Sequence, residues 1–298
     1  MSDPNKNKPV DDVTGTETTG HTWDGIEELN SPLPRWWLWT FYATVIWGIA
    51  YTIAYPAWPM VSGATAGLLG YSTRGEVARD IDAFREASAA RDSQLAEADL
   101  VTLASTNEDL YRYAVSSGAA VFRNNCSQCH GSGAAGAKGY PNLLDDDWLW
   151  GGTHEAIAYT VRHGIRNDED DDARYSEMPA YGEILSEEEI AALVEHVRSL
   201  SGMEHDEALA ASAVENFTDN CTACHGDNGM GNVDLGAPNL TDAIWLYGGD
   251  REALTETITN ARFGVMPPWG PPRLTEAQVQ AVATYVHQLG GGQTDAGN

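Results

Sequence analysis

Two nearly identical stretches decide the fold: FRNNCSQCHG, residues 122–131, and FTDNCTACHG, residues 217–226. Each holds two cysteines separated by two residues, followed at once by histidine and glycine. Cys-x-x-Cys-His is the attachment signature of c-type haem. Two Cys-x-x-Cys pairs could also form a tetrahedral zinc site, but zinc does not require a histidine directly after each pair. The sequence therefore predicts two covalently attached c-type haems.

The sequence around these motifs repeats as well, which marks two copies of one structural unit. PNLLDDDWLWGG starts at Pro141 and PNLTDAIWLYGG starts at Pro238. Each copy then continues to a short methionine loop, MPAYG at 178–182 and MPPWG at 266–270. The order predicted for each copy is helix, haem loop, helix, methionine loop and helix.

The closing segment of each copy reads as an amphipathic helix. Ser186 with Glu189, and Thr275 with Gln278, form capping boxes that start these helices. The apolar residues that follow recur at helical spacing. Those residues are Ile190, Leu193, Val194, Val197 and Leu200 in the first copy, and Val279, Val282, Val286 and Leu289 in the second. The predicted fold is mainly α.

The thiols of each motif, Cys126 with Cys129 and Cys221 with Cys224, would bind the haem covalently. The histidine after each pair then falls beneath the iron, so His130 and His225 are the predicted proximal ligands. The carbonyl of Pro141 or Pro238 could accept the proton on the other imidazole nitrogen, which would orient each ring.

Met178 and Met266 are the predicted sixth ligands, because they occupy equivalent positions and each precedes a proline. Their alternative role is core packing. Met203 has no counterpart in the repeat, and Met230 lies too close to His225 to reach the opposite face of the ring. The same absence of repeat partners makes the remaining histidines surface or hydrogen-bonded residues: His154, His163, His196, His205 and His287.

Histidine–methionine ligation closes both axial positions and raises the reduction potential. A closed iron does not readily bind oxygen or peroxide, so the pattern favours electron transfer over catalysis at the haem. The aromatic residues that recur at matching positions are expected to pack on the haems. They are Trp148 with Trp245, and Tyr181 with Trp269.

Residues 36–60, WWLWTFYATVIWGIAYTIAYPAWPM, contain no charge and are long enough to cross a membrane as a helix. Tryptophans at one end and Tyr55 with Trp58 at the other match the aromatic belts of the two interfaces. The segment is too long for the apolar region of a signal peptide. We therefore expect an uncleaved membrane anchor.

The charges flanking this span barely favour one orientation. Lys6, Lys8 and Arg35 precede it, and Arg74 and Arg79 follow it. Because bacteria attach haem to apocytochromes c outside the cytoplasmic membrane, we expect the haem domains on the periplasmic side of the inner membrane. The organisation predicted is a cytoplasmic N-terminal segment 1–35, a transmembrane helix 36–60, a periplasmic linker 61–107 read as a spacer, and cytochrome c domains 108–202 and 203–298.

The formal net charge is −27, from 44 acidic and 17 basic residues. Nucleic acid is excluded as a partner, since binding it requires a basic face. The same charge would steer a basic soluble protein toward the chain, although it also fits a simple role in solubility.

The membrane region and the residues after it carry a specific family resemblance. HTWDGIEELNSPLPRWWLWTFYATVIWGIAYTIAYPAWP, residues 21–59, and STRGEVARDIDAF, from Ser72, resemble the dihaem subunit III of cbb3-type cytochrome c oxidases. The resemblance runs to about Gly290. It implies an electron-transfer subunit of a terminal, proton-pumping oxidase, which receives electrons from cytochrome c donors. It also implies partner subunits, one monohaem and one that reduces oxygen.

The resemblance assigns the haem ligands to the residues named above: Cys126, Cys129, His130, Met178, Cys221, Cys224, His225 and Met266. The histidine-to-methionine separations of 48 and 41 residues leave two pairings open. Each methionine could serve the haem of its own repeat, or the two could be exchanged. Two other functions also remain open, a free-standing membrane-anchored dihaem carrier and a dihaem peroxidase.

Overall fold

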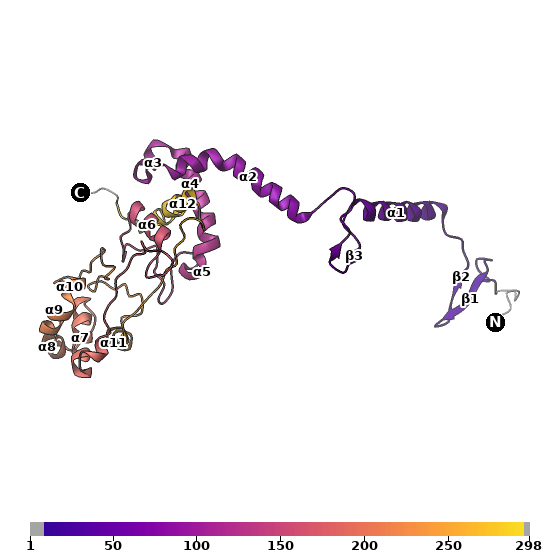
Figure 1. Ribbon diagram of the computed structural model, residues 1–298. Helices are drawn as coiled ribbons and strands as arrows, with labels where there is room; N and C mark the ends of the chain where they lie inside the picture. The colour runs from indigo at the N-terminus through magenta and orange to yellow at the C-terminus, as the bar shows by residue number, and fades with distance from the viewer. Residues whose placement is uncertain (1–8, 295–298) are drawn as a thin grey trace. The chain divides into compact units, whose positions relative to one another are not determined.

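The computed structural model describes residues 9–294, and the chain forms two compact units, Met1–Glu86 and Ala87–Asn298 (Figure 1). Lys6 and Lys8, which enter the charge comparison across the span, lie outside the described residues.

The first unit opens with a β-hairpin. Strands β1 (Thr18–Trp23) and β2 (Ile26–Leu29) pair antiparallel, with Trp23 opposite Ile26. Asp24 and Gly25 make the turn with φ values of 50° and 85°. Two-residue hairpin turns favour positive φ at both positions, and this explains the Asp-Gly pair.

Helix α1 (Arg35–Ala54) follows the hairpin and has a mean hydropathy of 1.2. It is the one helix in the described part of the chain that is long and apolar enough to cross a membrane. The helix ends six residues earlier than the predicted span 36–60. Pro56 explains this difference, because the residue before a proline disfavours helical dihedrals, and Tyr55 is extended with ψ at 161°. A short hairpin of β3 (Pro59–Met60) and β4 (Gly63–Ala64) comes next.

The predicted spacer is partly core. Helix α2 (Thr73–Ala96) and helix α3 (Leu100–Thr106) occupy most of it. Leu95, Leu100 and Leu103 are buried in the same hydrophobic cluster as the first haem motif. The end of this stretch is therefore not a spacer but part of the first core. The three leucines were missed because they are few in a charged, alanine-rich sequence.

The second unit is helical and holds both haem motifs. In chain order its remaining helices are α4 (Glu108–Val121), α5 (Ser127–His130), α6 (His154–His163), α7 (Glu187–Leu200), α8 (Glu207–Ser212), α9 (Val214–Asn220), α10 (Thr222–His225), α11 (Arg251–Asn260) and α12 (Glu276–His287). A π-helical turn, Phe122–Cys126, joins α4 to α5. Both predicted capping boxes are present at the starts of α7 and α12.

The helices of the second unit gather into two cores, and Figure 1 shows them as two groups. In the first core, α12 packs along α4 and against α6, and it buries Val279, Val282 and Val286. In the second core, α7 packs on α8, α9 and α11 and buries Leu193, Val194 and Val197.

The two cores exchange their closing helices. The core that contains Cys126 is closed by α12, which belongs to the second sequence repeat. The core that contains Cys221 is closed by α7, from the first repeat. Each core thus draws residues from both predicted ranges, 108–202 and 203–298, and the ranges describe the repeat in sequence rather than the packing.

The contact between α4 and α12 is close at Gly118. A Cβ atom added there would meet the carbonyl oxygen of Ala281, and would lie 2.7 Å from Cβ of Tyr285. Glycine therefore allows the two backbones to approach, and this approach seals the first core.

Gly118→Ala should lower the free energy of unfolding of the second unit by about 1–3 kcal/mol, because the added methyl forces α4 and α12 apart. Thermal unfolding followed by circular dichroism should show a midpoint several degrees lower than that of the wild type. Gly75→Ala is the matched control: it also lies in a helix, and its added Cβ would meet Ser72 Cβ at an ordinary 3.5 Å. A Gly118→Ala midpoint equal to that of the control would refute the tight contact.

Candidate haem-binding site

Each haem motif forms a short helix that presents its histidine in the same way. Nδ1 of His130 lies 3.1 Å from the carbonyl oxygen of Pro141, and Nδ1 of His225 lies 3.0 Å from that of Pro238. A carbonyl can only accept, so Nδ1 carries the proton and Nε2 is left with a lone pair for a metal. The predicted bonds to the two prolines are thus confirmed.

A glycine directly follows each histidine because the chain must turn there with positive φ. Gly131 has φ 80° and Gly226 has φ 78°, values that side chains other than glycine rarely adopt. Each histidine carbonyl then accepts a 2.8 Å hydrogen bond from a later glycine, Gly136 in the first motif and Gly231 in the second. The two motifs therefore hold their histidines on matching loops.

Burial disfavours the charged form of one cysteine and of the histidine in each motif. It raises the pKa of the Cys126 and Cys221 thiols to about 11, and the neighbouring cysteine of each pair adds to the shift. Burial also lowers the pKa of His130 and His225, against the opposing effect of the proline carbonyls.

All eight predicted ligand residues line one cavity of about 810 Å³ in the second unit. They are Cys126, Cys129, His130, Met178, Cys221, Cys224, His225 and Met266. Met203 and Met230, which the sequence argued against, do not line it. The two motifs therefore open into a shared space rather than into separate pockets.

The second methionine loop lies on the first haem motif. Met266 forms two backbone hydrogen bonds with Ile165, at 2.9 and 3.0 Å, and packs against the core that contains Cys126. Further along the loop, the amide of Trp269 donates to the carbonyl of Val161 in α6 at 2.9 Å. This loop thus adds a short antiparallel bridge to the first repeat.

The first methionine loop lies on the second haem motif. Met178 packs against the core that contains Cys221. The hydroxyl of buried Tyr181 donates a 2.5 Å hydrogen bond to the carbonyl of Asn220, the residue just before that cysteine. The loops are exchanged in the same sense as the closing helices, and the repeated aromatics Tyr181 and Trp269 are exchanged with them.

Two unpaired indole nitrogens on the cavity wall indicate that a haem fits there. Nε1 of Trp150 and Nε1 of Trp245 are buried without a hydrogen-bond partner among the described residues. Indole nitrogen only donates, and buried donors nearly always have an acceptor. A haem carries carboxylates that can accept such bonds, so the cavity suits it. Trp148, by contrast, donates to the carbonyl of Gly291 at 2.6 Å.

The haem loops also interlock across the cavity. Trp150 of the first repeat packs so closely on Gly236 that a Cβ there would overlap the indole. In the matching contact, Tyr247 of the second repeat packs on Gly139, where an added Cβ would lie 3.3 Å from its ring. The two haem loops therefore support one another.

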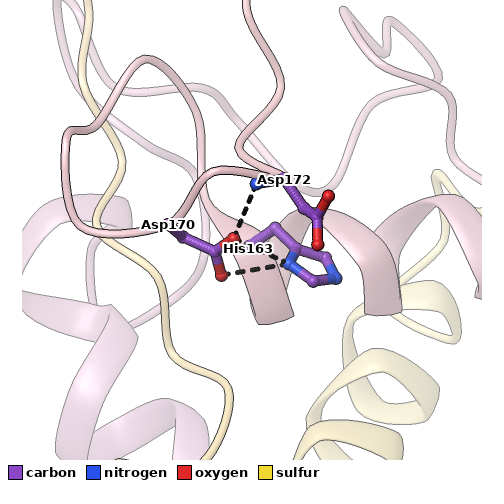
Figure 2. A group of neighbouring side chains, drawn as sticks. All are labelled: His163, Asp170 and Asp172. Atoms are coloured by element: carbon purple, nitrogen blue, oxygen red, sulfur yellow. Dashed lines mark hydrogen bonds and ion pairs between the residues drawn. The ribbon is translucent and has the colours of Figure 1, made fainter.

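The histidines without repeat partners have structural contacts. His163 lies 3.0 Å from Asp170, and this ion pair closes the acidic loop that leads to Met178 (Figure 2). His154 stacks on His287 with ring centroids 3.6 Å apart, and His196 packs on Phe217. His205 hydrogen-bonds the carbonyl of Met203.

Sequence reasoning missed Trp150 and Arg166, which both line the cavity. The guanidinium of Arg166 binds carbonyls just before both methionine loops, at Ser176 and Gly264. Comparison of the repeats hides both residues, because their equivalent positions hold Tyr247 and Phe263. Only their positions on the wall of the folded cavity identify them as candidate site residues.

Three sequence families match successive parts of the chain. Residues 15–62 match the N-terminal domain of cytochrome oxidase-cbb3, FixP. Residues 115–201 match cytochrome c, and residues 208–286 match cytochrome c oxidase, cbb3-type, subunit III. The first match covers helix α1, so the chain is membrane-anchored. The other two are cytochrome c domains, and the chain therefore has two c-type haems as cofactors.

Whole-length relatives agree with these matches. The chain is 60% identical to the cbb3-type cytochrome c oxidase subunit CcoP of Cereibacter sphaeroides, over 97% of this chain and 99% of that protein. It is 52% identical to subunit FixP of Azorhizobium caulinodans, over 96% and 97%, and 53% identical to CcoP of Rhodobacter capsulatus, over 93% and 96%. The chain belongs to the CcoP/FixP family of cbb3-type cytochrome c oxidase subunits.

Proposed function

We propose that this chain takes electrons from a cytochrome c donor and passes them, through its two haem sites, toward the oxygen-reducing subunit of a cbb3-type oxidase. A monohaem subunit is the proposed next partner, and the chain itself does not reduce oxygen. Each c-type haem, when bound, supplies an iron that gains and loses one electron. The chain's own residues bind the two groups, orient them and keep them close.

The observation that carries this proposal is the shared cavity. Residues of both haem motifs line it. Exchanged helices and interlocked loops fix one site against the other. Two redox sites held rigidly around one space are suited to pass electrons between them. Fixing the two sites close together is the main contribution that a protein makes to such a relay.

The proposed axial ligands are His130 with Met266 for the first haem, and His225 with Met178 for the second. The bridge between Met266 and Ile165 and the packing of Met178 on the core of Cys221 support this exchanged pairing. Thioether groups of these two methionines would occupy the sixth position of each iron, which favours a relay over peroxide chemistry.

The proposed pairing can be tested in chains with a single haem. In a chain carrying Cys221→Ala and Cys224→Ala, only the first motif attaches haem. Met266→His should then lower the midpoint potential by on the order of 0.1–0.3 V, part of the roughly 0.8 V range that axial ligands set. Met178→His in the same background is the control and should leave the potential unchanged. The reciprocal result in a redox titration would favour pairing within each repeat.

The proposed orientation puts residues 1–35 in the cytoplasm and the haem sites in the periplasm, beside the inner membrane. The requirement that c-type haem is attached outside the cytoplasmic membrane supports it. A periplasmic donor would then meet the larger part of a chain whose total formal charge is −27. This charge favours a basic protein as the donor.

Oxygen uptake driven by a basic cytochrome c should therefore fall as ionic strength rises, by roughly tenfold or more where steering dominates. The screening length is about 10 Å at 0.1 M salt. Uptake driven by a small neutral reductant is the control and should change little. Equal salt dependence with both reductants would contradict the steering role of the acidic surface.

The assignment to an oxidase is tested by purification from membranes of the native host. A tagged chain should copurify with a haem–copper oxidase and with cytochrome c oxidase activity. The double variant Cys126→Ala and Cys129→Ala should retain the partners but lose donor-driven oxygen uptake, since one relay site is missing. A fully haem-loaded chain that purifies alone would instead indicate a free-standing dihaem carrier.

A further inference from the structure

The side chain of Arg166 contacts the segments just before both methionine loops. Its Nε donates to the carbonyl of Ser176 at 2.7 Å, and its Nη1 donates to the carbonyl of Gly264 at 2.9 Å. Ser176 lies two residues before Met178, and Gly264 lies two residues before Met266. One guanidinium therefore joins the segments that lead to the two proposed ligands.

The charge of Arg166 has no counter-ion within ion-pair distance among residues 9–294. Its hydrogen bonds go to neutral carbonyls, and Glu177 acts on it only from farther away. Burial lowers the pKa of its guanidinium, yet arginine stays protonated. Its remaining N–H donors are free to bind an acidic group in the cavity that it lines.

The backbone of Arg166 is also unusual. Its φ is 49°, a left-handed value that residues with long side chains seldom adopt. The amide of Arg166 donates to the carbonyl of Arg174 at 2.9 Å, and its neighbour Ile165 pairs with Met266. These bonds hold the residue in a strained conformation that directs its side chain between the loops. Strain of this kind concentrates at functional sites.

The other arginines near the cavity differ from Arg166. Arg262 lines the cavity but lies 3.8 Å from the carboxylate of Glu256. Arg174 stacks over the rings of Tyr159 and Trp150, as Arg166 does over that of Phe263, but its side-chain hydrogen bonds go to Thr160 and Ala156 instead of the segments before the methionine loops. The repeat offers no second copy of Arg166, since Phe263 holds the equivalent position after α11. A single cation thus serves two otherwise matching sites.

We propose that Arg166 is a shared positioning residue that raises the reduction potentials of both haems together. This inference rests on the function proposed above. A guanidinium has five N–H donors, and those not used on the loops are available to a carboxylate of a bound haem. An oxidised haem iron carries one more positive charge than a reduced one. A half-buried cation beside both sites therefore disfavours both oxidised states, with little screening by water.

The test is a redox titration of the full-length, haem-loaded chain, with covalent haem content measured first. Arg166→Gln should lower both midpoint potentials in the same direction. Arg166→Met, a second neutral variant of similar length, should do the same if the glutamine variant loses haem. Arg166→Lys keeps the charge but not the forked geometry, so both potentials should stay closer to those of the wild type.

Arg262→Gln is the matched control, because it also removes a cavity-lining cation, one already balanced by Glu256. It should shift the potentials less than Arg166→Gln. The inference is overturned if the neutral Arg166 variants shift one potential or neither, if Arg166→Lys falls as far as they do, or if Arg262→Gln lowers both equally.

The methionine variants separate failure of this inference from failure of the proposed function. If Met178→His and Met266→His shift potentials while Arg166→Gln does not, only the role of Arg166 is wrong. If neither methionine variant shifts a potential, the ligand assignment itself fails.

Discussion

The packing of α12 on α4 is the contact on which the rest of the haem unit depends. It carries the end of the second repeat onto the first, and the methionine loop before α12 comes with it. The approach of the two helices at Gly118 leaves no room for a side chain. Because α7 makes the corresponding contact in the other core, the chain cannot separate into two independent domains without exposing both apolar faces.

The same interlocking accounts for the electrostatics of the site. Residues from both repeats surround one cavity, so burial acts alike on the two histidines and on the two buried thiols. Burial thus disfavours charge on all four groups, in a chain whose overall charge is strongly negative. Arg166 also lies on this shared wall, a cation held by the carbonyls of Ser176 and Gly264, just before the two methionine loops.

Much of this arrangement could be predicted from the sequence, since local chemistry determines it. The sequence was sufficient to predict the haem motifs and both capping boxes. It was also sufficient to predict the proline carbonyls that hold His130 and His225. The exchange of helices was not, because two similar repeats offer equally good apolar faces to either partner. The core role of Leu95 was hidden in a charged helix. Arg166 could not be predicted by comparing the repeats, because such a comparison selects residues that both repeats share, and Phe263 stands at the equivalent position.

The exchanged closing helices also determine the order in which the two cores can close during synthesis. The motif at Cys126 emerges first, but the helix that seals its core starts 150 residues later, at Glu276. The motif at Cys221 emerges second, and α7, which seals its core, has by then been made. The first site to leave the ribosome is thus the last to close, and it stays open to the haem-attaching machinery for longer. A chain cut before α12 would lose the seal of its first core and keep that of its second.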